Sequence, residues 1–208
     1  LLPLTSAVGL DFEWPVYQTG RPGPVATMQV AVCGAAGIVV YVFQLPQLVA
    51  PGTKKLPCEL AQFLIQETPK KVGVALRGDV TRLCRDYDLE ASNGGKVPHH
   101  PRGLTELGEV VAARLGQYHP DVADGRQVRS LSLVKLGMLV LKKQLPKPHH
   151  LQVTERWDQA ILDPSLVTYA ATDAWAVLYI VQAVETMEPP SAVAAAAAAS
   201  TSRGSRSS

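Results

Sequence analysis

Two acidic residues stand two positions apart in a short apolar stretch near the start of the chain. Asp11 and Glu13 alternate with Leu10 and Phe12, and the stretch is typical of a strand that ends at Pro15. Side chains two apart on a strand point to the same face, so both carboxylates would lie together. Neighbouring anions at the edge of a core repel each other, and a divalent cation relieves that repulsion. A solvent-facing acidic stripe is the alternative, and the spacing alone leaves both open.

Three more residues extend this pattern. Asp79 follows Gly78 at the end of a short predicted strand, where its alternative role is to cap a helix. Tyr169 and Asp173 are four apart in a predicted helix and so share one face, although a packed aromatic beside a surface acid would have the same spacing. Together the four acids and the phenol have the layout of a two-metal phosphodiesterase, whose ions lie ~3.5–4 Å apart. Such oxygen ligands suit Mg²⁺ or Mn²⁺.

The elements that must position these residues form two groups along the chain. Three strand-like stretches joined by tight turns predict an antiparallel meander at residues 7–14, 25–33 and 38–43. Helical periodicity then alternates with one more strand, predicting helices at 58–67, 79–87, 104–115, 130–143 and 164–185 and a strand at 71–76. Residues 92–103, 118–129 and 146–152 are predicted to be loops. This order indicates an α/β domain with a mixed sheet.

Composition excludes several classes of protein. The 208 residues carry 20 basic and 18 acidic side chains, a net charge of +2, which excludes a polycationic nucleic-acid-binding protein. Three cysteines without zinc-finger spacing argue against a disulfide scaffold or a zinc site and favour a reducing intracellular compartment. The bulky apolar runs fall short of the roughly 20 residues that a membrane helix needs, so no membrane contact is expected. Residues 1–187 are predicted to form one domain, and 188–208 a disordered Ala/Ser/Arg-rich tail.

Five blocks in fixed order make the chain resemble a known family. The blocks are residues 8–15, 72–83, 106–115, 130–136 and 169–175. They are similar to the DEDDy branch of the DnaQ-like 3′–5′ exonucleases, and most of all to the Werner-syndrome type of exonuclease domain and its plant and fungal relatives. The resemblance implies a ribonuclease H-like α/β fold. Its mixed five-stranded sheet would combine an antiparallel three-strand meander with parallel strands, flanked by helices.

The resemblance also implies an activity and a set of site residues. It predicts a 3′–5′ exonuclease that uses two divalent cations, Mg²⁺ or Mn²⁺, and releases nucleoside monophosphates from DNA with a free 3′ end. RNA as substrate, as in ribonuclease D, and a catalytically silent nucleic-acid-binding module are the alternatives. We expect an intracellular, nuclear protein with a role in DNA repair.

By the same resemblance each site residue has an expected role. Four acids would hold the metal ions, and Tyr169 would orient the attacking water. The expected metal ligands are Asp11, Glu13, Asp79 and Asp173, and the expected nucleic-acid contacts are Phe12, Trp14, Lys147 and Arg156. Some relatives carry an aromatic residue two positions after the third acid, where this chain has Thr81.

Overall fold

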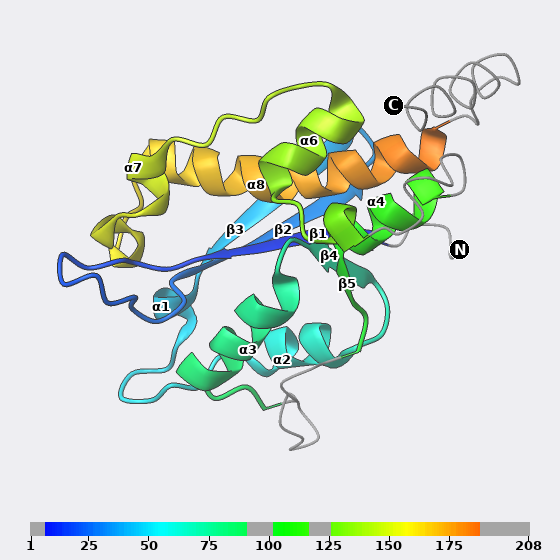
Figure 1. The fold of residues 1–208 in the computed structure, drawn as a ribbon. Helices are drawn as coiled ribbons and strands as arrows, with labels where there is room; N and C mark the ends of the chain where they lie inside the picture. Colours follow the sequence, from blue (N-terminus) through cyan, green and yellow to red (C-terminus); the bar gives the residue numbers. More distant parts are fainter. Residues whose placement is uncertain (1–6, 91–101, 117–125, 188–208) are drawn as a thin grey trace, which may run out of the picture.

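The structure is a computed structural model that describes residues 7–90, 102–116 and 126–187 (Figure 1). The predicted tail at 188–208 lies outside the described residues, as do most of the predicted loop at 92–103 and residues 118–125 of the second predicted loop.

A five-stranded mixed sheet forms the centre of the domain. Its spatial order is β3-β2-β1-β4-β5. The strands are β1 (Ala7–Glu13), β2 (Thr27–Gly34), β3 (Gly37–Gln44), β4 (Lys70–Gly73) and β5 (Leu104–Glu106). Strands β1, β2 and β3 pair antiparallel, whereas β1 with β4 and β4 with β5 pair parallel. The predicted meander and the predicted mixed sheet are both confirmed.

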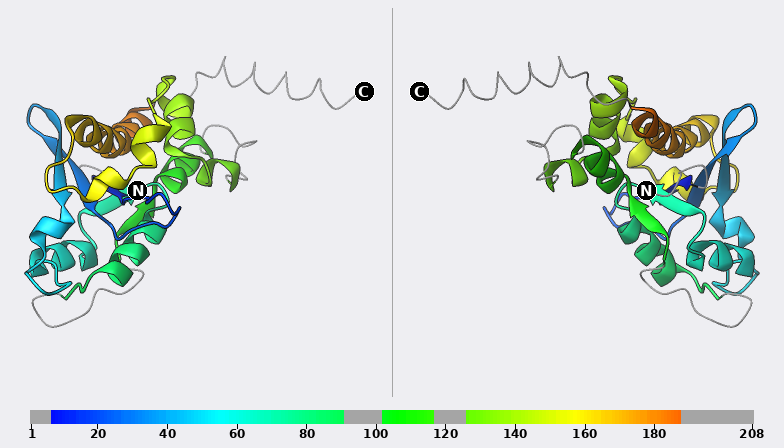
Figure 2. Two further views of the ribbon diagram at one scale, coloured as in Figure 1. Left: turned by 90° about the vertical axis from the view of Figure 1, so that its left-hand side faces the viewer. Right: turned by 90° about the vertical axis from the view of Figure 1, so that its right-hand side faces the viewer.

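Helices cover both faces of this sheet (Figures 1 and 2). Helices α2 (Cys58–Ile65) and α3 (Leu76–Asp86) pack on one face, where Leu10, Phe12 and Met28 belong to the core. Helices α4 (Leu107–Gly116), α6 (Leu133–Leu141) and α8 (Pro164–Thr186) form a second cluster on the opposite face. Four shorter helical turns complete the described residues, namely α1 (Leu45–Leu48), α5 (Arg126–Arg129), α7 (His149–Gln152) and a 3₁₀ turn (Glu155–Asp158).

Helix α8 lies across the sheet and, with 23 residues, is the longest helix that the structure describes. Asp163 starts the helix by accepting a hydrogen bond from the Ser165 N–H, and Pro164 occupies its first turn. The helix is long and apolar enough to cross a membrane by length and composition. However, 56% of its apolar window is buried inside the protein, and the helix packs on β1, β2 and β3. We therefore interpret α8 as the core helix of the domain.

The structure corrects several predicted boundaries. The helix predicted at 104–115 begins with the three residues of β5, which pair with β4 and are too few to show a period in sequence. The strand predicted at 71–76 ends at Gly73, because Ala75 takes a left-handed conformation (φ 56°) directly before α3. Helix α6 is shorter than the predicted 130–143, since Lys142 is left-handed (φ 55°). The single-turn helices α5 and α7 occupy segments predicted to be loops.

Candidate active site

Three carboxylates from β1 and α8 meet on the face of the sheet that α8 covers. Asp11, Glu13 and Asp173 each offer an oxygen, and these atoms all lie within 4.8 Å of one another. Asp11 and Glu13 reach this face through the alternation of β1, as expected. The predicted strand pair, Asp11 and Glu13, therefore lies beside Asp173 of the predicted helix pair. Asp173 comes 160 positions after Glu13 in the chain.

A glycine in β1 lets α8 approach closely enough to form this cluster. A Cβ atom placed on Gly9 would lie 2.5 Å from the carbonyl oxygen of Ala174. No side chain can occupy that space without moving the helix or the strand. Asp173 precedes Ala174 in the chain, and Asp11 lies two residues beyond Gly9. The close approach therefore sets the separation of the two acids.

Asp79 follows the β4–α3 connection and is not one of these three carboxylates, although its charge raises the pKa of Asp11 and of Glu13. It lies in the first turn of α3, which begins at Leu76, so the alternative that Asp79 is the helix N-cap is wrong. Glu106 of β5 takes that role, because its carboxylate accepts hydrogen bonds from the Leu76 N–H (3.3 Å) and the Arg77 N–H (3.1 Å). Asp79 therefore has no capping function, and its negative charge raises the pKa of Asp11.

The electrostatics of the three-carboxylate cluster and of the nearby Asp79 disfavour the ionisation of all four carboxyl groups at once. Burial raises the pKa of Asp11 well above its ordinary value, and the charges of Asp173 and Asp79 raise it further. Burial and then Asp11 likewise raise the pKa of Glu13. Burial and then Glu106 raise the pKa of Asp79 to about 7, while Arg82 opposes the rise. Such a cluster keeps its charge at neutral pH only when a cation compensates it.

Lys147 supplies one compensating charge. Its ammonium lies 3.9 Å from Oδ2 of Asp173 and lowers the pKa of that carboxyl, although burial still raises it overall. One ammonium against four carboxylates leaves most of the repulsion in place. Further positive charge at the site would therefore lower the electrostatic repulsion among these carboxylates.

The donor atoms around the cluster fit a hard divalent cation. Gln29 lies opposite Asp11 in the β1–β2 ladder, and its Nε2 donates a hydrogen bond to Oγ1 of Thr27 (2.6 Å). Its Oε1 is buried and has no hydrogen-bond partner among the described residues. A buried amide oxygen without a partner is costly, so this acceptor, on the residue opposite Asp11, is a further candidate oxygen ligand. Carboxylate and amide oxygens are the ligands that Mg²⁺ and Mn²⁺ prefer.

Tyr169 is held against the cluster as a protonated phenol. Its hydroxyl hydrogen-bonds Asp173, one helical turn away. Its ring is 6% exposed and packs 6.1 Å from the ring of Trp157, whose indole N–H donates to the Leu151 carbonyl. Burial, and then the charge of Asp173, raise the pKa of Tyr169 far above its ordinary range. The hydroxyl can therefore donate a hydrogen bond at working pH but cannot serve as a base.

The predicted nucleic-acid contacts lie in different surroundings. Lys147 is beside the acids, as described. The guanidinium of Arg82 stacks over the Trp14 ring at 4.3 Å, and Arg156 pairs with Asp163 at the start of α8 (3.5 Å). Phe12 is 3% exposed and belongs to the core on the other face of the sheet. Contacts of these residues with nucleic acid stay predictions.

Sequence reasoning missed Gln29, Arg82 and Glu106 as parts of the site. Gln29 had one available signal, since a polar residue two positions after Thr27 on a buried strand must share its face. Glu106 had no such signal in the sequence, because its contact with the start of α3 depends on β5 lying beside β4. Arg82 contacts the Trp14 ring and donates to the Gly23 carbonyl (2.6 Å), a contact between segments about 60 residues apart.

Comparison with known proteins agrees with this geometry. The sequence model of a family described as 3′–5′ exonuclease matches residues 2–187. The mouse bifunctional 3′–5′ exonuclease/ATP-dependent helicase WRN is 30% identical over 84% of this chain, and the human exonuclease 3′–5′ domain-containing protein 2 is 34% identical over 80%. The chain spans 10% and 23% of these two relatives, so the similarity concerns one domain of longer proteins.

The fold has a solved counterpart. The structure of Trypanosoma brucei RNase D in complex with RNA U12 has a TM-score of 0.60 to this chain, at 18% identity, covering 94% of this chain and 61% of that one. This likeness concerns the fold alone, and the predicted ribonuclease H-like class is confirmed. The match to the family model and the sequence similarity to the two relatives show that the chain belongs to the 3′–5′ exonuclease family.

Proposed function

We propose that this chain is a metal-dependent exonuclease that hydrolyses DNA from its 3′ end and releases nucleoside monophosphates with the help of two divalent cations. The observation that carries the proposal is the meeting of three carboxylates within 4.8 Å, with the Tyr169 hydroxyl bonded to one of them. Membership of the exonuclease family supports the nuclease activity itself. The DNA preference rests on the sequence resemblance to the Werner-syndrome type of domain.

Each acid has a proposed share in holding the cations. Asp11 lies in the carboxylate cluster and its pKa is raised by the charges of both Asp173 and Asp79, so it would contribute to holding both ions. Glu13 and Asp173 would complete one ion's ligands, and Asp79 would serve the other. When bound, the cations supply a lowered pKa for the attacking water and compensation of charge on the leaving oxygen.

The remaining residues would act on the water and on the phosphate. Tyr169, fixed by Asp173 and by the Trp157 ring, would hold the attacking water through its hydroxyl. Because its pKa is raised, it would position that water without taking its proton. Lys147 is 33% exposed and sits at the edge of the cluster, so its ammonium can turn from Asp173 to a substrate phosphate.

A time course on 5′-labelled substrates tests the proposal. Single-stranded DNA, a recessed DNA duplex and RNA of the same sequence would be incubated with Mg²⁺ or Mn²⁺, and with EDTA. We expect a descending ladder on DNA, slower cleavage of RNA, and no cleavage in EDTA. A 3′-phosphate should delay the start of the ladder, because the site accepts a free 3′ end.

The matched control is Asp173→Asn, which keeps the shape of the side chain and removes its charge. Immediate release of a labelled 5′ mononucleotide would show the opposite polarity. Faster cleavage of RNA than of DNA would replace DNA with RNA as the substrate. Binding without cleavage by the wild-type chain, under every metal condition, would favour the silent module.

A further inference from the structure

Strand β3 is one edge of the sheet, and its surroundings are unusually apolar. Among the described residues no strand lies beyond it. Val39, Tyr41 and Phe43 point to the face that carries α2, yet they remain 45%, 53% and 37% exposed. An edge strand with exposed apolar side chains is a template for pairing with another strand.

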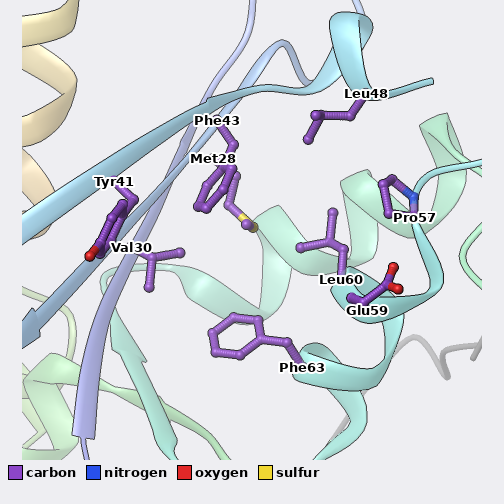
Figure 3. A pocket seen from close by; sticks show the side chains of 9 residues that line it. All are labelled: Met28, Val30, Tyr41, Phe43, Leu48, Pro57, Glu59, Leu60 and Phe63. Atoms are coloured by element: carbon purple, nitrogen blue, oxygen red, sulfur yellow. The ribbon is translucent and has the colours of Figure 1, made fainter.

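A pocket opens on the same face, between β3 and α2. Its volume is about 380 Å³. Figure 3 shows Met28 and Phe43 on the sheet side of the pocket and Leu60 and Phe63 of α2 across from them, with Tyr41 farther along β3. The Tyr41 and Phe43 rings stack at 6.4 Å, so the wall of the pocket at the sheet edge is aromatic. Helix α2 thus leaves the outer part of this face uncovered.

The other face of the same edge is apolar as well. Trp175 and Tyr179 stack on α8 with 4.7 Å between ring centroids, and both are partly exposed. Gln182 lies seven residues after Trp175, hence on the same side of the helix, and it contacts Cys33 near the β2–β3 turn. The Trp175–Tyr179 stack therefore lies on the side of α8 that faces the β2–β3 hairpin.

The edge also lacks the charges that usually protect edge strands. No Asp, Glu, Lys, Arg or His occurs from residue 22 to residue 53, which includes all of β2 and β3. Protective charges, prolines and bulges are the devices that keep edges apart, and β3 pairs with β2 residue by residue without a bulge. An identical strand brought against β3 would meet no like charge. The surface is therefore compatible with its own copy.

We propose that β3 is the interface of a two-fold homodimer, in which the β3 strands of two copies pair antiparallel and join their sheets. The two-residue connection between Gly34 and Gly37 makes these residues a hydrogen-bonded pair, so Val40 and Val42 turn their backbone groups to the open edge. Two-fold pairing of those groups places Tyr41 opposite Tyr41 of the copy.

This register also brings apolar side chains opposite each other along the whole pairing. Phe43 of one copy lies opposite Val39 of the other, an aromatic and β-branched pair of the kind that stabilises sheets. Val40 lies opposite Val42 on the face of α8. The two pockets become neighbours on one face, and the two Trp175–Tyr179 stacks face each other on the other. Because β2 separates β3 from β1, the acid cluster stays accessible.

Measuring molar mass by light scattering or sedimentation from about 1 to 100 µM tests this interface. We expect the wild-type chain to become a dimer as concentration rises and to stop there, because a two-fold interface closes on itself. Tyr41→Lys should remain a monomer with full exonuclease activity. Met138→Lys, which removes a 47% exposed apolar side chain on α6, should dimerise like the wild type.

The register is tested by Tyr41→Cys under mild oxidation, with Met138→Cys as the control. Residues opposite each other in a non-hydrogen-bonded antiparallel pair are ~4.5 Å apart at Cα, within disulfide range. Mass spectrometry should find a disulfide that joins position 41 of one copy to position 41 of the other. A monomeric wild-type chain at 100 µM would overturn the proposal and leave the edge to a strand from another protein. A Tyr41→Lys dimer, open-ended assemblies, or a dimer without the cross-link would overturn it too.

Discussion

At the scale of single residues, the acid cluster combines high mutual repulsion with low exposure. Asp173→Asn removes a charge from the cluster and one oxygen ligand from the proposed metal site. We expect turnover to fall at least ~10²-fold, the scale of one lost electrostatic partner. Stability in EDTA should not fall, because the repulsion of Asp11 and Glu13 is relieved.

Single-turnover rates with Mn²⁺ and thermal unfolding in EDTA measure the two effects. Asp158→Asn, an acid that accepts a hydrogen bond from Tyr17 at the surface, is the matched control. A wild-type rate in Asp173→Asn, still abolished by EDTA, would remove Asp173 from the metal ligands.

Tyr169 allows a test of hydrogen bonding separate from packing. Tyr169→Phe keeps the ring against Trp157 and removes only the hydroxyl that bonds Asp173. We expect kcat to fall by about 10²-fold with little change in KM. The rate should also keep its wild-type pH dependence up to about pH 9, because a phenol with a raised pKa does not titrate there. A fully active Tyr169→Phe would show that the tyrosine only packs.

At the scale of elements, the site depends on the close packing of α8 on β1. Gly9→Ala would place a methyl group 2.5 Å from the Ala174 carbonyl oxygen, so the helix and the strand must separate. We expect a loss of about 1–3 kcal/mol in the free energy of unfolding, as for other overpacked cores. Activity should fall more than stability implies, because displacement of Asp173 from Asp11 misplaces the proposed catalytic groups.

Urea unfolding and kcat measure both parts of this prediction. Gly78→Ala is the stability control, since a Cβ there meets nothing within 4 Å and alanine favours a helix. Gly78→Ala should be as stable as the wild type or more so. If Gly9→Ala is equally stable and active, the close approach is not what positions Asp173.

At the scale of the whole molecule, the cluster makes stability depend on pH and on metal together. The pKa of Asp79 is raised to about 7 in the folded chain, from an ordinary value of 3.8, and those of Asp11, Glu13 and Asp173 are also raised. A raised pKa in an acid means that the folded chain holds protons which the unfolded chain has lost. The stabilisation of the folded chain by these bound protons is complete below about pH 4 and is lost as the pH rises through 7.

In EDTA we therefore expect the melting temperature to fall by about 2–4 °C per pH unit between pH 5 and 7. Mg²⁺ at millimolar concentration should offset the fall at pH 7.5 and have little effect at pH 5, because it binds the ionised carboxylates. Asp79→Asn should flatten the slope in EDTA. A melting temperature that rises with pH in EDTA would contradict the raised pKa values.

Much of the fold and of the site could be predicted from local patterns. The alternation in β1 predicted that Asp11 and Glu13 share a face, and the spacing in α8 predicted that Tyr169 and Asp173 do. Strand β5 could not be predicted, because three residues show no period and pair only once β4 lies beside them. The alternative of a capping role for Asp79 was wrong for the same reason, since Glu106 reaches the start of α3 only from β5.

The sequence by itself determined which residues can do chemistry and which elements carry them, because side-chain type and local periodicity are properties of short segments. The ordered blocks also determined the family. Only the tertiary structure decided how the acids meet, because that depends on the close approach of α8 at Gly9. It alone decided that Lys147 faces Asp173 and that Phe12 lies in the core. It likewise left β3 as an apolar edge, since strand order follows from contacts between segments far apart in the chain.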